Sequence, residues 1–191
     1  LLNLSYGYGK AYVVPHEIVN GQVQGGVCEL PFKQFPTGIM RGRFHPGDGQ
    51  LYGGGMFAWS STQRQPGGFY RIRATGKPAH MPVALTTARQ TVQITFTDPL
   101  DRKSAEDVNT WTVEAWDLKR SKSYGSRHHN QRKWPVKNAT LSNHGKTITL
   151  TIPDLAPTWS MSITANIHGE NGEPVRREIH NTIHHLEDRL D

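Results

Sequence analysis

The sequence predicts an all-β protein, in which the last one to two blades of a β-propeller are followed by an immunoglobulin-like β-sandwich. Three observations lead to this prediction. Runs of β-branched and aromatic residues recur along the 191 residues, turn residues separate these runs, and a proline-rich break divides them into two groups. The predicted parts are the partial propeller at residues 1–76, a linker at 77–82 and the sandwich at 83–191.

The partial propeller is expected to begin with a hairpin and to continue as a meander. Residues 10–19 and 23–32 are predicted strands around Asn20-Gly21, a dipeptide typical of two-residue hairpin turns. They resemble the outer hairpin of one blade. Because a blade buries its faces against neighbouring blades, this part needs cover from the sandwich or from other polypeptide. Three further strands have the number and spacing of one whole blade: 38–45, 50–56 and 69–75.

The second group contains seven short strands and little helix, which is typical of an immunoglobulin-like sandwich. One short helical turn is expected at 99–108. The polar and basic stretch 117–135 is expected to form a long surface loop. The strands are expected at 83–87, 91–97, 111–116, 137–141, 147–152, 160–167 and 178–184.

Composition narrows the classes of function. The chain has 22 basic and 16 acidic residues, a formal net charge of +6, which permits binding to anionic polymers. No apolar run approaches about 18 residues, so we expect no membrane span. Cys28 is the single cysteine, which excludes an internal disulfide, a cysteine-based zinc site and CxxCH haem attachment in this chain. The start Leu1-Leu2-Asn3 indicates a processed product or part of a longer protein.

Several segments carry a pattern seen in a known family: 2–10, 15–26, 35–46, 48–52 and 67–73. They resemble the final blades of large secreted bacterial propeller proteins of the soluble quinoprotein (glucose/sorbosone dehydrogenase-like) family, many of which carry a c-type haem domain. The segments 95–101 and 179–184 resemble the sandwich that follows that propeller.

The resemblance implies a secreted or periplasmic bacterial protein whose propeller holds a redox cofactor. In working members a His acts as general base on a sugar hydroxyl, hydride passes to pyrroloquinoline quinone (PQQ), and Arg side chains stabilise the developing charge. Most of those residues lie on earlier blades, so we assign no catalytic residue and expect no cofactor within this chain alone. PQQ would belong to the complete propeller and haem c to another domain. The remaining blades are the implied partner.

Arg41, Arg43 and His45 alternate along one predicted strand, so they are expected on the same face. If that strand is the innermost of its blade, they face the channel, where a substrate oxygen or a quinone carboxylate binds. The alternative is structural: Arg43 pairs with an acid of a neighbouring blade, and His45 caps the following turn. His16 beside Glu17 is a further candidate, for metal binding or proton transfer, with an ordinary hydrogen-bonded role as its alternative.

Other aromatic and histidine residues are weighed in the same way. Trp59 could stack on a sugar ring, with packing at a blade edge as the alternative. His180 and His184 share a face, but strand geometry places them about 13 Å apart, which is too far for one metal ion. We therefore expect no metal site.

One basic stretch resembles a contact for an anionic polymer, because residues 118–153 contain no acid. No nucleic-acid docking motif appears, so the expected partner is a sugar, a sulfated or uronic polysaccharide or an acidic protein, and not nucleic acid. The alternative is a solvated loop that keeps the protein soluble. The residues assigned to the contact are Lys119, Arg120, Arg127, Arg132, Lys133 and Trp134.

Two functions follow from these observations. In one, the chain is the C-terminal portion of a quinoprotein-like sugar or alcohol dehydrogenase and lacks a complete active site. In the other, it is a non-catalytic extracellular module that binds an anionic polysaccharide or acts as a scaffold.

Overall fold

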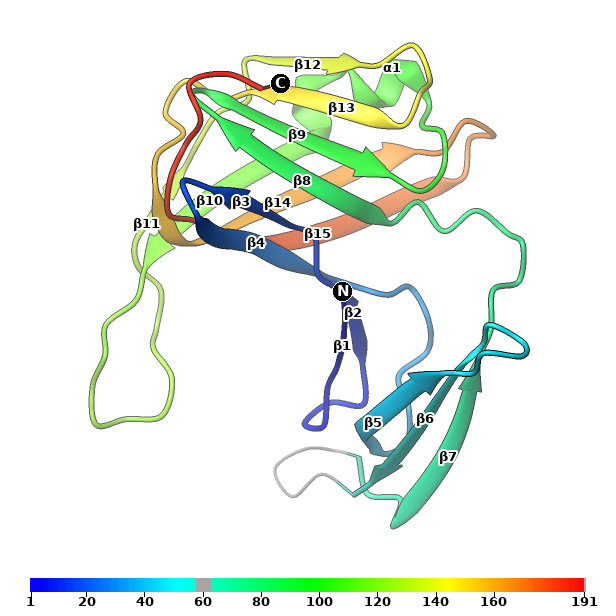
Figure 1. The fold of residues 1–191 in the computed structure, drawn as a ribbon. Coiled ribbons are helices and arrows are strands. Elements are labelled where there is room, and N and C mark those ends of the chain that lie inside the picture. Colours follow the sequence, from blue (N-terminus) through cyan, green and yellow to red (C-terminus); the bar gives the residue numbers. More distant parts are fainter. Residues whose placement is uncertain (58–62, 191) are drawn as a thin grey trace. The chain divides into compact units, whose positions relative to one another are not determined.

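The computed structural model describes residues 1–57 and 63–190, and it is all-β with antiparallel sheets (Figure 1). The chain forms two compact units. Leu1–Val13 and Glu29–Ala79 make the first unit, and Val14–Cys28 and His80–Asp191 make the second unit.

The second unit contains two sheets. The larger sheet is built from β3 (His16–Val19), β4 (Gln22–Glu29), β10 (Trp111–Asp117), β11 (His129–Lys133), β14 (Thr158–His168) and β15 (Pro174–Ile183). Its order is β11–β10–β14–β15–β4, and β3 also pairs with β4. The smaller sheet is built from β8 (Pro82–Ala88), β9 (Thr91–Phe96), β12 (Asn138–Leu141) and β13 (Thr147–Thr151), in the order β12–β13–β9–β8.

Alternating apolar residues give these strands one buried face. In β9, Val92, Ile94 and Phe96 are at most 1% exposed, and they are the face that the sequence predicts. Each such side chain contributes roughly 1.5–3 kcal/mol of hydrophobic stabilisation. Both sheets supply the core, and its other large members include Ile148, Leu150, Met161, Ile163, Ile167, Ile179 and Ile183.

Two helical turns, α1 (Arg102–Ala105) and η1 (Val108–Thr110), connect β9 to β10. Asp101 begins α1, because its carboxylate accepts a hydrogen bond from the Ser104 N–H at 2.8 Å. The Trp111 indole then donates to the carbonyl of the last residue of α1 at 2.9 Å. The helical turn expected at 99–108 is confirmed within these limits.

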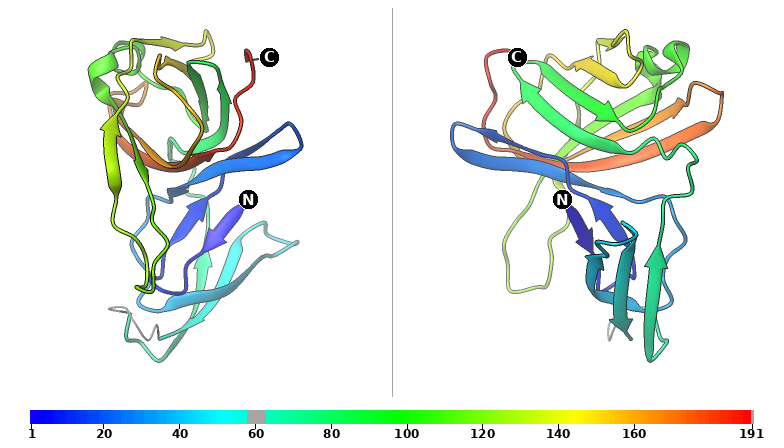
Figure 2. Two further views of the ribbon diagram at one scale, coloured as in Figure 1. Left: turned by 90° about the vertical axis from the view of Figure 1, so that its left-hand side faces the viewer. Right: turned by 45° about the vertical axis from the view of Figure 1, so that its right-hand side comes forward.

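The first unit contains a hairpin of β1 (Leu2–Leu4) and β2 (Ala11–Val13). It also contains a three-stranded antiparallel sheet of β5 (Gly38–Phe44), β6 (Leu51–Met56) and β7 (Gly67–Ile72). The right-hand panel of Figure 2 shows these three strands side by side.

The seven strands expected after residue 82 are all present. The Asn20-Gly21 turn is confirmed as well, with φ of +50° and +75°, the two positive values that a type I′ turn requires. Its hairpin pairs with β15, where Cys28 lies opposite Ile179. Residues 14–28 therefore belong to the second unit, whereas the sequence grouped them with the partial propeller.

The prediction of a loop at 117–135 is wrong for its last part, because residues 129–133 form β11, which pairs with β10 and places Lys133 opposite Glu114. An edge strand tolerates polar residues, which hid this strand from a hydrophobicity pattern. No helix in the described parts of the chain is long and apolar enough to cross a membrane.

Candidate functional site

The net positive charge of the protein lies in its first unit. This unit has eight basic and two acidic residues, whereas the second unit has fourteen of each. A charge surplus on the smaller unit favours anionic partners for that unit. Four of the eight basic residues are arginines on the β5–β6–β7 sheet or directly after it.

Strand pairing places these arginines on one side of the sheet. Residues opposite each other in antiparallel strands share a face, as do alternate residues along one strand. Arg43 lies opposite Tyr52, which lies opposite Arg71. We call this side the arginine–aromatic face, and its members are Arg41, Arg43, Tyr52, Gly54, Phe69, Arg71 and, just past β7, Arg73.

Two aromatic rings stack between the arginines. The ring centroids of Tyr52 and Phe69 are 5.8 Å apart with an interplanar angle of 25°, and Phe69 is 76% exposed. The His45 ring meets Tyr52 edge-on, with centroids 5.9 Å apart. The stacked pair offers a flat apolar surface to a planar ligand or a sugar ring.

Asp48 orients the polar groups at one end of this face. Its carboxylate accepts hydrogen bonds from the Gln50 N–H at 2.9 Å and from the Tyr52 hydroxyl at 2.8 Å, and His45 Nδ1 lies 3.3 Å away. These contacts, the Gln50 N–H foremost, hold the pKa of Asp48 below its ordinary value. Asp48 is therefore ionised near neutral pH, and it fixes the positions of Tyr52 and His45.

An open hollow lies where β5 ends. It has a volume of about 490 Å³ and is lined by Arg43, Phe44, His45, Pro46, Tyr52 and Phe69. Gly54 leaves the middle of the face bare, since a Cβ there would meet no atom within 4 Å. Gly55 serves packing instead: a Cβ there would lie 1.8 Å from the Gly38 carbonyl oxygen.

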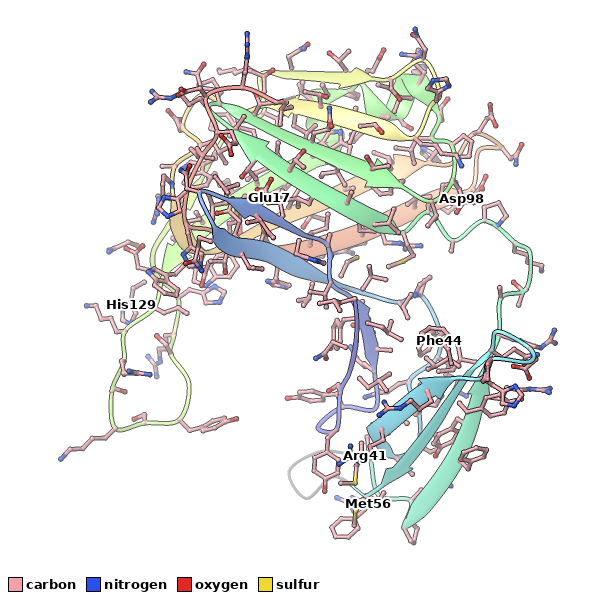
Figure 3. All side chains as sticks on the ribbon, viewed as in Figure 1. Glu17, Arg41, Phe44, Met56, Asp98 and His129 are labelled. Carbon is pink, nitrogen blue, oxygen red and sulfur yellow. The ribbon has the colours of Figure 1, made fainter. Side chains whose placement is uncertain are left out.

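The arginines of the arginine–aromatic face are available to bind a ligand. All four are exposed, and within the described residues none of them takes part in an ion pair. Arg43 donates to the Gly42 carbonyl at 3.0 Å. Figure 3 labels Arg41, Phe44 and Met56 on this sheet. A guanidinium group binds carboxylate or sulfate through two parallel hydrogen bonds, so the face can bind an anion beside an aromatic surface.

His16 belongs to the second unit, whereas Arg41, Arg43 and His45 belong to the first. The His16 ring is exposed, and its Nδ1 lies 3.2 Å from the Val14 carbonyl. Glu17 serves a structural contact: it accepts hydrogen bonds from the Thr87 hydroxyl and N–H and from the Gln24 amide. His16 and Glu17 therefore do not form a joint proton-transfer pair.

The predicted anionic-polymer contact divides into three groups. Lys119, Arg120 and Arg127 are exposed, as a solvated loop or a binding loop requires. Arg132 and Lys133 lie near acids of β10, at 3.3 Å from Asp117 and 4.0 Å from Glu114. Trp134 is only 6% exposed and has the Arg132 guanidinium over its ring at 5.6 Å. It therefore does not present a stacking surface to a polymer.

The remaining predicted positions are the candidate metal ligands and Trp59. No group of three or more metal-ligating residues occurs in the described ranges. His180 pairs with Glu178 at 3.5 Å, and His184 lies edge-on to Trp159. Trp59 lies outside the described residues.

Sequence reasoning missed Tyr52, Phe69, Arg71 and Arg73. The alternation of residues 69–73 was visible and indicates that Phe69, Arg71 and Arg73 share a face. That this face is also the face of Arg41 and Arg43 depends on strand register, which a single sequence does not determine.

Comparisons of this chain with protein-family models, with curated proteins and with solved structures gave no match.

Proposed function

We propose that this chain is the C-terminal part of a secreted or periplasmic bacterial quinoprotein-like protein, a sugar or alcohol dehydrogenase type. In this proposal the β5–β6–β7 sheet is a propeller blade and the second unit is an immunoglobulin-like sandwich. The proposal rests on the sequence resemblance and on one structural observation: the described residues of the first unit bury only three apolar side chains, Ala11, Ile39 and Leu51. So small a core contributes little stability, and the unit needs cover from other polypeptide.

The exposed apolar side chains of the first unit support the same proposal. They include Met40 at 56%, Phe44 at 64% and Phe57 at 47% exposure. Large apolar side chains gathered on one small unit mark a contact surface. In a propeller, the neighbouring blades cover such surfaces, and they would be the partner of this unit.

The residues present do not make a complete quinone site. Unpaired Arg41 and Arg43 suit a quinone carboxylate, but the hollow beside them is open, and the described residues enclose no cavity there. Cys28 is buried and is the only cysteine, so it provides no covalent haem attachment. We therefore derive no catalytic step from this chain, and any quinone would be held mainly by other blades.

The test compares this chain with a longer version that includes the preceding blades. We expect the longer protein to bind added PQQ and to reduce a dye in the presence of sugars, and this chain to do neither. Arg41→Ala/Arg43→Ala in the longer protein should weaken quinone binding at least tenfold. Lys119→Ala/Arg120→Ala, two exposed residues of the second unit, serves as the control. Failure of the longer protein to bind quinone and to reduce the dye would overturn the enzyme proposal.

A second candidate function is non-catalytic binding of an anionic polysaccharide. The observation that favours it is the concentration of the whole net charge in the first unit, where four arginines that form no ion pair with any described residue surround a stacked Tyr52–Phe69 pair. Carboxylates or sulfates of the polymer would bind the guanidinium groups, and a sugar ring would lie on the aromatic pair.

Retention on immobilised heparin and alginate, eluted with salt, tests this candidate. The unmodified chain should elute late, and Arg71→Ala/Arg73→Ala should elute at clearly lower salt, because surface charge pairs are screened. The matched control Lys103→Ala/Arg176→Ala removes the same charge from exposed positions of the second unit outside the predicted basic contact, and it should have the smaller effect. Equal shifts for both double variants would indicate non-specific attraction and contradict a role of the face.

A further inference from the structure

The second unit has one solvent-exposed tryptophan, Trp159. Trp159 is 75% exposed and lies where the β14–β15 register shifts, between Thr158 and Met161. The Thr182 hydroxyl donates to the Trp159 carbonyl at 2.9 Å, which fixes the backbone at this irregularity. The indole ring meets the His184 ring edge to face, with centroids 5.1 Å apart at 81°. The indole ring is therefore both accessible to solvent and held in one orientation.

His184 also lines a cleft of about 640 Å³, within the range of small-molecule sites. Leu155 and Pro157 give this cleft an apolar part. Its polar lining includes Asn20, Gln90 and His185. Because His184 contacts Trp159 and also lines the cleft, the exposed indole lies beside the cleft.

Buried Gln24 fixes the backbone of this surface. Its side-chain oxygen accepts hydrogen bonds from the N–H groups of His184 at 2.8 Å and His185 at 3.0 Å. Its side-chain nitrogen donates to the His185 carbonyl at 3.0 Å and to Glu17 at 2.7 Å. Gln24 is 4% exposed, so these bonds lie in a low-dielectric environment, where they hold the two histidines firmly.

The cleft is nearly neutral. Among the described residues that line it, Arg89 is the one with a formal charge, and it pairs with Asp188 at 2.9 Å. In the described part of the chain, the side chains of Asn20, Gln90, His184 and His185 make no hydrogen bond, and the His184 ring has only its edge-on contact with Trp159. Uncharged donors and acceptors beside an exposed indole suit a ligand that has many hydroxyl groups and no charge.

We propose that this surface binds a neutral pyranose ring of a polysaccharide. The apolar face of the sugar stacks on Trp159, and its hydroxyls form hydrogen bonds with His184 and Gln90. This inference concerns residues of the second unit alone and does not depend on either function proposed above.

The proposal is tested by titrating the protein with cellohexaose, xylohexaose, mannohexaose or maltohexaose and following its intrinsic tryptophan fluorescence. We expect at least one of these oligosaccharides to give a saturable change. Trp159→Ala should weaken its binding at least tenfold, because stacking is lost, and Gln90→Ala should weaken it several-fold. Since binding by Trp159→Ala is less visible by fluorescence, calorimetry provides the same comparison.

Tyr124→Ala, which removes a fully exposed aromatic side chain of the second unit, is the matched control and should leave the affinity unchanged. Trp159 is mostly exposed, so Trp159→Ala should keep the unfolding midpoint of the unmodified protein. Absence of saturable binding for all four oligosaccharides at millimolar concentration would overturn the proposal. So would equal affinities of Trp159→Ala and the unmodified chain.

Discussion

At the scale of single residues, one buried cluster ties separate segments of the second unit together. Glu17 of β3 accepts hydrogen bonds from the Thr87 hydroxyl at 2.6 Å and from the Gln24 amide at 2.7 Å. The Thr87 N–H also points to this carboxylate, at 3.1 and 3.2 Å from its two oxygens. A partly buried carboxylate is stable only with such donors, so each donor carries a measurable share of stability.

Thr87→Val should lower the free energy of unfolding by about 1–3 kcal/mol, because it removes a buried donor and leaves the Glu17 carboxylate short of one partner. This loss of stability is measured by urea unfolding, with tryptophan fluorescence as the signal. Thr87→Ser keeps the hydroxyl, so its free energy of unfolding should fall clearly less than that of Thr87→Val. If the valine variant is as stable as the unmodified protein, Glu17 does not depend on this hydroxyl.

Asp101 provides a prediction about pH. The Ser104 N–H, which its carboxylate caps, holds the pKa of Asp101 below its ordinary value of about 4. A carboxyl whose pKa is lower in the folded state stabilises the fold above its ordinary pKa, and this contribution is lost as the pH falls through the lowered value. Stability should therefore decline below about pH 4.

Asp101→Asn separates the cap from the charge, because asparagine also caps helices well but does not titrate. The variant should match the unmodified protein near pH 7 and lose less stability between pH 4 and pH 2, as measured by urea unfolding at each pH. An identical acid dependence of both proteins would show that other carboxyls account for the decline.

The two tryptophans Trp134 and Trp159 show what residue type alone does not reveal. The sequence assigned Trp134 to a ligand contact because it lies in a basic stretch, yet its side chain is 6% exposed. Trp159 drew no attention because it precedes an alternating strand, yet it is 75% exposed. A shift in register at residues 158–161 turns Trp159 outward, and such a shift leaves no mark in composition or periodicity.

At the scale of elements, the β3–β4 hairpin is the least expected part of the fold. Its turn was predictable, because Asn20-Gly21 supplies two residues that tolerate positive φ. The strand with which this hairpin pairs, β15, was not predictable, because the pairing joins residues about 150 positions apart. Local signals predict strands and turns well, whereas the choice of a distant neighbour depends on packing.

Gly26 makes this pairing possible. A Cβ at this position would lie 2.2 Å from the His180 carbonyl oxygen of β15. Gly26→Ala should therefore force the two strands apart and lower the thermal midpoint of the second unit by several degrees, as measured by circular dichroism.

Gly21→Asn is the matched control in the same hairpin. Gly21 has nothing within 4 Å of an added Cβ, and asparagine tolerates its φ of +75°. This variant should keep the midpoint. If Gly26→Ala unfolds at the same temperature as the control, the close approach of β4 to β15 is not important for stability.

At the scale of the whole molecule, the two units differ in both charge and core. The first unit carries the net charge of +6 and buries three apolar side chains in its described part, whereas the second unit is balanced in charge and supplies nearly all of the core. Charge repulsion and a small core both lower the stability of the first unit relative to the second. The all-β class and the strands of the second unit were predictable from alternation, but this asymmetry required knowing which unit contains residues 14–28.

Hydrogen exchange on the full chain tests this asymmetry. Peptides from β14 and β15 should exchange only through global unfolding, whereas peptides from β5–β7 should exchange at least about 100-fold faster, a difference of about 2.7 kcal/mol in opening free energy. Peptides from residues 16–28 provide the sharpest comparison, because they lie in sequence between two segments of the first unit but pair with β15. They should be protected like β15, although residues 1–13 and 29–57 on either side exchange quickly. Protection of β5–β7 equal to that of β15 would show that the first unit is stable without further cover, and it would remove the structural support for a neighbouring blade.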